Sequence, residues 1–563
     1  MKPIIYQILT RLFGNKNEEC KLNGNRDENG VGKMDDISEK ALSEIHKLGI
    51  THIWYTGIIE HALVKGYPDC DIPDGNPLVI KGKAGSPYAI KDYYDVNPDL
   101  AVDADKRIEE FQDLIERTHQ ANMKVIIDFI PNHLAREYYS DKKPLGIVDF
   151  GKDDDNSKAF DRDNNFYYMP NENLYLPDSL LEKHPIASYS EKPAKATGND
   201  IFSAYPSVND WYETVKLNYG IDYLNGRNKH FDPIPDTWLK MEQVISYWAA
   251  MGVDAFRCDM VEMVPVEFWN WLISVVKLSF PNLIFIAEVY DPQKYDSYIE
   301  YGKFDYLYDK VGLYDTLKRV IQGDSKTSDI SQCWQNLNGK DAHMLRFLEN
   351  HDEQRIASAF FAGEPTRAIP AMFIVATLNK GPIMLYFGQE VGEAADGVSG
   401  YSKDDGKTTL FDYWRVPQYQ KWMNDGKFDG GRLLNSQKEL RKSYHDILNI
   451  AQKDAVVNGE FYDLMWYNPA SSESDTSRYY FYLRYTHLQH LLMIVNFYNC
   501  EKEIRVKIPK HAFELMGMPK NGKLRLEANN ATIDTITCEE FLNKGKSFKL
   551  PKWGYLVCKI SSF

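Results

Sequence analysis

Four acids in this chain stand at the ends of short apolar runs. The runs are KVIIDFIPNH, GVDAFRCD, IFIAE and FLENHD, and the acids are Asp128, Asp259, Glu288 and Asp352. A run such as Val-Ile-Ile is typical of a strand buried on both faces, as in a parallel sheet. An acid that follows such a strand lies at its carboxyl end, where a β/α barrel gathers its catalytic groups.

Two carboxyl groups at one barrel mouth are suited to splitting an acetal. One protonates the departing oxygen and the other supports the oxocarbenium-like transition state. Asp259 and Glu288 end successive predicted strands, so we expect their side chains to lie side by side. In retaining enzymes such groups are about 5–5.5 Å apart, and the anion becomes a covalent nucleophile.

Other polar residues stand where they could serve that pair. Arg257 precedes Asp259 by two residues and therefore points to the same side of its strand. We expect it to keep Asp259 ionised through a charge-assisted bond, and Asp128 to brace Arg257. Asp352 is expected to hydrogen-bond sugar hydroxyls on the opposite side of the barrel mouth and to distort the ring toward the transition state.

His133 and His351 could hydrogen-bond the same hydroxyls, and Tyr88 could stack on the sugar ring. Each of these residues alone has an ordinary structural explanation. A lone strand-end Asp is usually a cap or turn residue, and a buried His or Tyr usually belongs to the core. Because all of them occur in order, each at the end of its own strand, we favour a joint site.

The elements that must position these side chains alternate between strands and helices. Predicted strands are Ile4–Leu9, Thr51–Tyr55, Val125–Ile130, Asp254–Cys258, Leu283–Ala287, Phe304–Tyr308, Met344–Leu348 and Ile383–Tyr386. The clearest predicted helices are Asp36–Leu48, Asp105–Ala121, Pro265–Lys277 and Ser436–Asp454. This pattern predicts an α/β fold, a closed (β/α)8 TIM barrel rather than an open doubly wound sheet.

Two further regions are expected beside the barrel, which takes residues 1–132 and 236–454. Residues 133–235 are too long for an ordinary connection, and their many aromatics favour a small inserted domain after strand three over a disordered loop. Alternating apolar and polar positions over 455–563 predict a C-terminal antiparallel β-sandwich domain.

The net charge and the spacing of the cysteines limit which partners and which structural sites the protein is expected to have. Lys+Arg total 66 and Asp+Glu 81, a net charge of −15 that disfavours nucleic acid or an anionic membrane. The seven Cys stand singly, which argues against a disulfide framework and a zinc site.

With no apolar run of membrane-spanning length and no signal peptide, we expect a cytoplasmic protein. A secreted or periplasmic protein whose signal has been removed is the alternative.

Several motifs together carry a family resemblance. They are Asp128, Asn132 and His133 in D-x-x-x-N-H, Arg257 and Asp259 in R-x-D, Glu288 after strand five, His351-Asp352 in N-H-D, Arg355, Tyr88 with Asp92-Tyr93, and Gly381–Glu390. In these, over its whole length, the chain resembles the α-amylase family of retaining α-glycoside hydrolases and transglycosidases. The resemblance implies that Asp259 is the nucleophile, Glu288 the general acid/base and Asp352 the transition-state stabiliser. It also implies that Tyr88, Asp128, His133, Arg257, His351 and Arg355 bind substrate.

Two positions depart from the family pattern. Lys216 stands where many members have an acidic calcium ligand, and an ammonium could replace the charge of the ion. We therefore expect no metal ligand and no required cofactor, with a structural calcium as the alternative, since Asn132 matches another ligand. Glu262 and Met263 stand where members that process α-1,4-glucan often have Lys-His, which leaves the choice of acceptor open.

The expected function is hydrolysis of α-1,4-glucosidic bonds in starch-type glucans or malto-oligosaccharides through a covalent glycosyl-Asp intermediate. The expected partner is an α-glucan or oligosaccharide substrate, with no nucleic acid and no membrane. A transglycosidase or an exo-acting α-glucosidase of the same family is the first alternative. A non-catalytic sugar-binding homologue is a remote one, because every acid and Arg257 are present.

Overall fold

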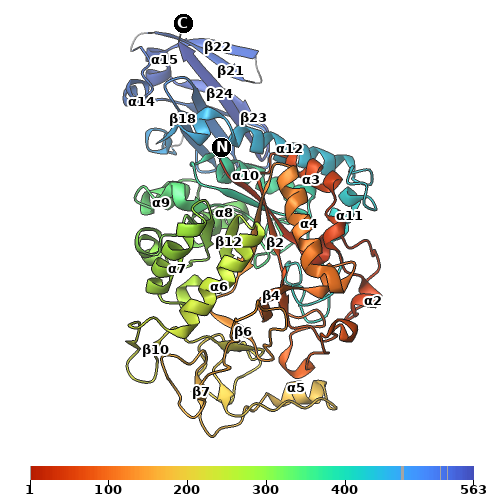
Figure 1. The fold of residues 1–563 in the computed structure, drawn as a ribbon. Coiled ribbons are helices and arrows are strands. Elements are labelled where there is room, and N and C mark those ends of the chain that lie inside the picture. The colour runs from red at the N-terminus through yellow and green to blue at the C-terminus, as the bar shows by residue number, and fades with distance from the viewer. Residues whose placement is uncertain (1, 471–474, 520–521, 529–530, 563) are drawn as a thin grey trace.

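Eight parallel strands form the centre of the protein, seen in Figure 1. The computed structural model describes residues 2–470, 475–519, 522–528 and 531–562. The strand order is β15-β14-β13-β12-β5-β2-β1-β16, and a parallel bridge between Arg346 and Ile383 joins the two outer strands. The sheet therefore closes on itself, and the TIM barrel predicted from the sequence is confirmed.

The barrel strands are short and almost wholly buried. They are β1 Ile4–Leu9, β2 His52–Thr56, β5 Lys124–Phe129, β12 Ala255–Cys258, β13 Ile284–Ala287, β14 Tyr306–Tyr308, β15 Met344–Leu345 and β16 Ile383–Tyr386. Four of them, β12, β13, β14 and β15, are shorter than predicted, and β15 is shortened most. After the bridge at Arg346, the chain leaves the sheet as a loop that carries His351 and Asp352.

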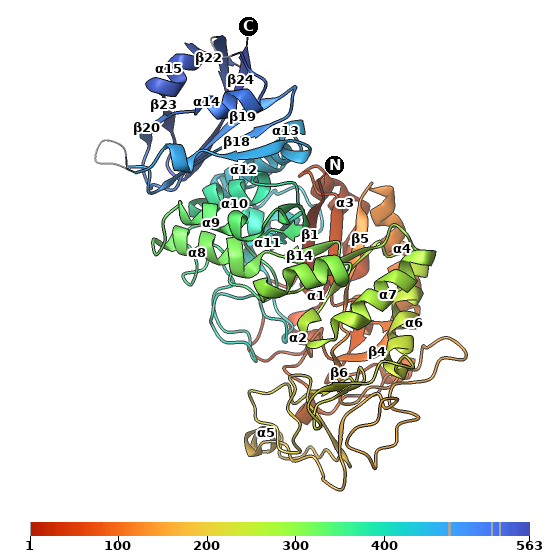
Figure 2. The same cartoon turned by 90° about the vertical axis from the view of Figure 1, so that its left-hand side faces the viewer.

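Helices surround this barrel in Figures 1 and 2. The longer ones are α3 Glu39–His46, α4 Arg107–Gln120, α6 Asp236–Met251, α7 Val266–Ser279, α8 Asp315–Gln322, α9 Asp329–Asn336, α10 Ile369–Thr377 and α12 Asn435–Ala451. The shorter ones are α1 Thr10–Phe13, α2 Arg26–Asn29, α11 Pro417–Met423 and α13 Asp454–Val457. Away from the barrel, α5 Asp178–Lys183 lies in the inserted segment, and α14 Lys510–Leu515 and α15 Cys538–Asn543 lie in the C-terminal region. In α3, for example, the Ser38 side chain accepts a hydrogen bond from the N–H of Ala41, and only one face is buried.

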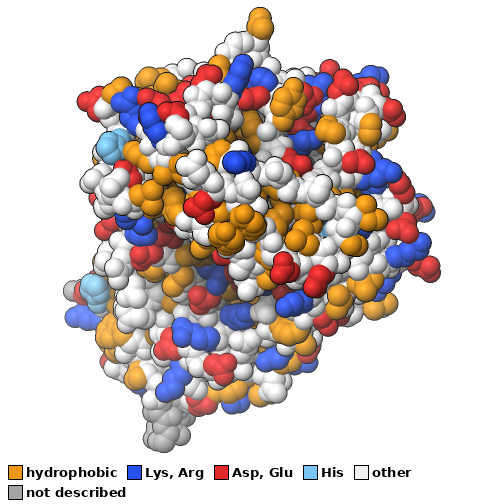
Figure 3. Space-filling model, turned by 90° about the horizontal axis from the view of Figure 1, so that it is seen from below, with side chains coloured by type: hydrophobic (Ala, Val, Ile, Leu, Met, Phe, Trp, Pro, Cys, Tyr) orange, Lys and Arg blue, Asp and Glu red, His pale blue; other side chains and the backbone are white. Residues whose placement is uncertain are grey.

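Residues 133–235 extend from the carboxyl ends of the strands, at the lower end of the molecule in Figure 1. Their strands are β6 His133–Ala135, β7 Tyr168–Met169, β8 Ala194–Lys195, β9 Thr214–Lys216, β10 Ile221–Asp222 and β11 Asn228–Lys229. They pair as β6 with β9, β7 with β8, and β10 with β11, all antiparallel. Figure 3 views this end and shows hydrophobic side chains gathered across its middle. A hairpin of β3 Ile59–His61 and β4 Ile90–Val96 lies between this segment and the barrel.

The C-terminal region is antiparallel. One sheet has the order β17-β18-β19-β24-β21-β22, and a second consists of β20 and β23. The strands are β17 Glu460–Asp463, β18 Tyr479–Tyr485, β19 His490–Asn496, β20 Lys502–Val506, β21 Lys523–Ala528, β22 Ala531–Thr537, β23 Lys546–Leu550 and β24 Gly554–Ser562. The second layer of the expected sandwich is thus narrow within the described residues.

The helix α10 joins the two regions. Every one of its residues is buried, because it packs between the barrel and the C-terminal sheet. Its Phe373 stacks on Tyr555 of β24 with ring centroids 4.1 Å apart. No helix among the described residues is long and apolar enough to span a membrane.

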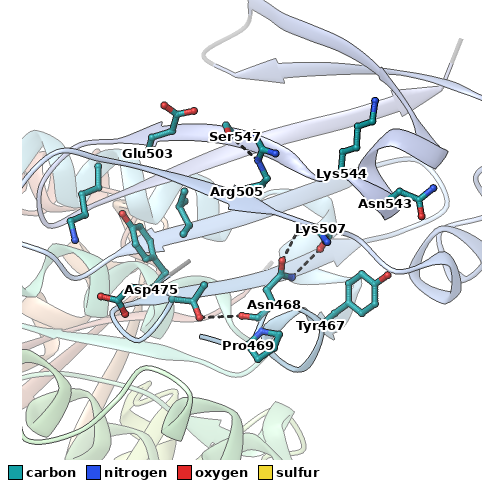
Figure 4. Close-up of a pocket in the computed structure, with 14 residues that line it drawn as sticks. Tyr467, Asn468, Pro469, Asp475, Glu503, Arg505, Lys507, Asn543, Lys544 and Ser547 are labelled. Atoms are coloured by element: carbon teal, nitrogen blue, oxygen red, sulfur yellow. Dashed lines mark hydrogen bonds between the residues drawn. The ribbon is translucent and has the colours of Figure 1, made fainter. Parts of the chain in front are cut away.

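A cleft of about 890 Å³ lies in the C-terminal region, shown in Figure 4. Its wall includes Asn468, which is bonded to the backbone of Lys507 in both directions, and Arg505, which donates to Ser547. All of its lining residues fall between Tyr467 and Ser547, so none comes from the barrel strands or from the loops at their carboxyl ends.

Candidate active site

One buried guanidinium group holds two of the predicted carboxylates. Arg257 Nη1 lies 2.7 Å from Asp259 Oδ1, and its Nη2 lies 3.0 Å from Glu288 Oε2. Strands β12 and β13 pair with Cys258 opposite Ala287, so Asp259 and Glu288 follow neighbouring strand ends. Since both nitrogens belong to one planar group, the two carboxylates lie side by side at the barrel mouth.

Three other strands support Arg257. Its Nε donates to the hydroxyl of Tyr308 on β14 at 3.1 Å. Asp128 on β5 lies 3.5 Å from Nη1 and accepts a 3.0 Å hydrogen bond from Trp54 Nε1 on β2. Asp128 therefore braces the guanidinium from behind, as the sequence predicted, and the Arg257 side chain has 1% of its surface exposed.

The buried pair resists carrying two negative charges. Burial, followed by repulsion from Glu288, raises the pKa of Asp259 well above its usual range, and Arg257 opposes the rise. Asp259 therefore retains a proton more readily than an isolated carboxyl does, although the Arg257 guanidinium favours its anion.

Glu288 is held by two further donors. Its Oε2 accepts the backbone N–H of Met260 at 2.9 Å, and its Oε1 accepts the hydroxyl of Tyr290 at 2.7 Å. Met260 has a left-handed φ of 43°, a strained conformation for a residue with a side chain. Such strain is concentrated at functional sites, and here it accompanies the fixed position of Glu288.

The third acid lies with a histidine and a tyrosine. His351 Nε2 is 3.0 Å from Asp352 Oδ2 and 2.5 Å from the Tyr88 hydroxyl, which also donates to Asp128 at 3.3 Å. The Gln7 amide lies 2.8 Å from His351 Nδ1 and fixes the ring from β1. Although burial opposes it, contact with His351 lowers the pKa of Asp352 below its usual range. The Asp352 side chain is 41% exposed, so it is an anion open to a ligand.

Two predicted substrate-binding residues lie further from the pair. His133, on β6, is buried beside Trp211 with ring centroids 5.1 Å apart, and burial with the charge of Lys216 lowers its pKa to about 3. Arg355 is fully buried and donates to Glu349 at 2.9 Å and to the Phe387 carbonyl at 2.8 Å. In this conformation Arg355 supports the loop after β15, and its contact with substrate stays a prediction.

The Lys216 ammonium joins the inserted segment to the barrel. Its Nζ donates to Asn132 Oδ1 at 2.5 Å and to the Met263 carbonyl at 3.1 Å, and it pairs with Asp200 at 2.7 Å. A cation thus occupies the position facing Asn132, as expected from the sequence. Glu262, the residue that precedes Met263, accepts the N–H of Tyr290 at 2.7 Å.

Four contacting residues were not singled out from the sequence: Gln7, Trp54, Tyr290 and Tyr308. Period-two spacing from Glu288 could have indicated Tyr290, because residues two apart in an extended segment point the same way. The other three lie within or at the end of predicted strands, where the sequence does not show which polar atoms face the barrel axis.

One family model matches most of the chain. The family model described as Alpha amylase, catalytic domain, matches residues 7–417. The chain belongs to the α-amylase family. It is accordingly a glycoside hydrolase of the α-amylase type, and the resemblance drawn from its motifs is confirmed.

The relatives described next share low sequence identity with this chain. Alpha-amylase 3 of Dictyoglomus thermophilum is 23% identical over 435 residues, which cover 74% of this chain and 70% of that one. The α-1,4-glucan:maltose-1-phosphate maltosyltransferase of Picrophilus torridus is 23% identical over 293 residues, 51% of this chain and 32% of that one. The solved α-amylase of H. orenii superposes with a TM-score of 0.63 at 19% identity, covering 100% of this chain and 99% of that chain. At that identity the superposition supports the fold alone.

Proposed function

We propose that the protein hydrolyses α-1,4-glucosidic bonds in starch-type glucans or malto-oligosaccharides with retention of configuration. The observation that carries the proposal is the single Arg257 guanidinium that forms ion pairs with both Asp259 and Glu288. Two carboxyls paired with one guanidinium suit the closely spaced arrangement of a retaining enzyme, whereas an inverting enzyme needs room between its carboxyls for an attacking water.

In the first step the Glu288 carboxyl donates its proton to the glycosidic oxygen. The bond from C1 to that oxygen breaks, and its electron pair stays with the departing sugar hydroxyl. An Asp259 oxygen attacks C1 from the opposite face and forms a β-glycosyl ester. The Arg257 bond at 2.7 Å keeps Asp259 aligned and stabilises its anionic form before attack.

In the second step the Glu288 carboxylate removes a proton from water. The water oxygen bonds to C1, the ester bond breaks, and Asp259 leaves as a carboxylate. Two displacements at C1 give an α-anomer. Asp352 and His351, opposite the pair, hydrogen-bond the ring hydroxyls more strongly as the ring flattens.

The names of relatives support the substrate assignment. The D. thermophilum relative is named an α-amylase, the P. torridus relative is named for α-1,4-glucan, and the net charge of −15 suits a neutral substrate. A cytoplasmic location remains part of the proposal, consistent with seven free cysteines.

A transglycosidase is the second candidate, favoured by the maltosyltransferase relative. In that case a sugar hydroxyl, not water, would attack the ester at Asp259. A product time course on soluble starch, pullulan, maltotriose and trehalose distinguishes the candidates. Hydrolysis predicts only shorter products from maltotriose, whereas early longer oligosaccharides would show transfer. Maltoheptaose with a blocked non-reducing end tests exo action, because an exo-enzyme cannot begin on it.

A further inference from the structure

Four carboxylates converge away from the active site. They belong to Glu60 on β3, Asp92 and Asp95 on β4, and Asp141 in the inserted segment. One oxygen from each lies within 4.8 Å of the others. Oxygens on opposite sides of Ca²⁺ are about 5 Å apart, because Ca²⁺ binds oxygen at about 2.3–2.6 Å. The four oxygens therefore fit within one coordination sphere.

The protein supplies fewer positive charges than this cluster needs. Arg107 bonds Asp95 through Nε at 2.8 Å and Nη2 at 2.5 Å. Lys91 Nζ lies 3.6 Å from Glu60 Oε1, too far for a hydrogen bond. Two cations thus face four carboxylates, three of which are at most 1% exposed. Uncompensated charge is costly at such burial.

A fully buried oxygen of the cluster has no hydrogen-bond donor among the described residues. Asp92 accepts from Ser140 Oγ at 2.6 Å, from the Tyr94 N–H at 2.8 Å and from the Lys142 N–H at 3.1 Å. Glu60 Oε2, in contrast, is buried without a hydrogen-bond partner among the described residues. The Glu60 carboxyl thus has a buried oxygen that a cation could satisfy.

We propose that Glu60, Asp92, Asp95 and Asp141 bind one Ca²⁺ ion. The ligands are all carboxylate oxygens, the donors that hard cations prefer. Asp141 is exposed and gives the ion a route from solvent, while the other three are buried. The ion would act as a structural clamp and not in the reaction.

The position of the cluster explains what such a clamp would hold. Residues 139–142 follow β6 in the inserted segment and lie along β4, where the Tyr139 N–H donates to the Lys91 carbonyl at 3.0 Å. Figures 1 and 2 both show β4 next to β6, at the junction of barrel and insertion. A cation shared by Asp92 and Asp141 would fasten the insertion to the β3–β4 hairpin, at a place separate from Lys216.

The test is the response of the full chain to Ca²⁺ after chelation. The wild type should bind one equivalent by calorimetry, and its melting temperature should rise by several degrees on saturation. Glu60→Gln should lose that rise, yet be at least as stable as the wild type in chelator, because it removes a buried charge. Asp141→Asn, at an exposed position, should keep its stability in chelator and bind Ca²⁺ at least about tenfold more weakly.

Asp153→Asn is the matched control, since it removes one exposed carboxylate of the inserted segment outside the cluster. It should bind Ca²⁺ like the wild type. Absence of binding by the wild type would overturn the proposal. So would an unchanged Ca²⁺ response in both Glu60→Gln and Asp141→Asn, which would place the ion elsewhere. A response to Mg²⁺ equal to that to Ca²⁺ would overturn the assignment of the metal.

Discussion

Arg257 Nη1 and Asp259 Oδ1 lie 2.7 Å apart, although the two residues are separated by only one position in the chain. Period-two geometry at the end of β12 brings both side chains to the same side of the strand. The same guanidinium forms an ion pair with Glu288, and the two carboxyls follow the ends of the paired strands β12 and β13.

If Asp259 forms the glycosyl ester, Asp259→Asn should lower kcat on maltotriose by at least about a thousandfold. An amide is a poor nucleophile and cannot replace the carboxylate. Circular dichroism should show an intact fold. Asp153→Asn removes an equal charge from an exposed loop and should keep normal turnover. Near-normal turnover of Asp259→Asn would refute its role.

Tyr308 was not singled out from the sequence, and its removal should affect catalysis. Tyr308→Phe leaves Arg257 Nε buried without its 3.1 Å acceptor, at a cost of roughly 1–3 kcal/mol in unfolding free energy. We expect kcat to fall about tenfold or more while KM changes less, because the guanidinium is no longer fixed. Tyr301→Phe, at a 49% exposed position, is the control. Equal kinetics in both variants would exclude this positioning role.

Lys216→Met should strongly destabilise the protein. It leaves the Asn132 amide oxygen and the Asp200 carboxylate without the ammonium that they share. Breaking a fully buried ion pair from one side typically costs about 3–5 kcal/mol. Because the Asp200 side chain is 32% exposed, we expect a loss below that range, measurable by urea unfolding. Lys229→Met, at an exposed ion pair, should unfold near the wild-type midpoint. An unchanged midpoint for Lys216→Met would show that the ammonium is dispensable.

Because His133 is buried, we expect the stability of the protein to depend on pH in the acid range. Burial, with the charges of Lys216 and Lys81, lowers its pKa to about 3, against roughly 6.5 in an unfolded chain. Between these values the unfolded chain binds a proton that the folded protein does not. Stability therefore falls as the pH falls, by about 1.4 kcal/mol per unit for this one group.

The variant that tests this is His133→Gln. Its loss of unfolding free energy between pH 6.5 and 4.5 should be roughly 2–3 kcal/mol smaller than that of the wild type. His487→Gln changes an exposed histidine and should keep the wild-type slope. An identical slope in His133→Gln would mean that His133 is protonated in the folded protein.

The fold could be predicted where apolar runs are continuous. The limits of β1 and β16 agree with the prediction to the residue, because each run is bounded by polar or turn residues. Helix α6 was not singled out, since its Trp238 packs against α7 while other residues contact β4, which blurs the amphipathic pattern. The exact domain limits stay a prediction.

In the site, the sequence revealed residues fixed by local spacing and missed those fixed by closure of the barrel. Arg257 and Asp259 could be related because they share one strand. Gln7 reaches His351 only because β1 and the loop after β15 meet around the closed barrel. The acidic cluster was also missed, because its residues are far apart in the sequence. The pairing of β3 with β4 and the path of the inserted segment bring Glu60 and Asp141 together.

Trapping the glycosyl-enzyme tests the central proposal most directly. The wild-type protein is incubated with 5-fluoro-α-glucosyl fluoride, and the intact mass and the peptide masses are measured. The proposal predicts one added fluoroglucosyl group, as an ester on Asp259 in the peptide that contains Arg257 to Asp259. A label on another carboxylate, or an inactivated protein without a covalent label, would contradict it.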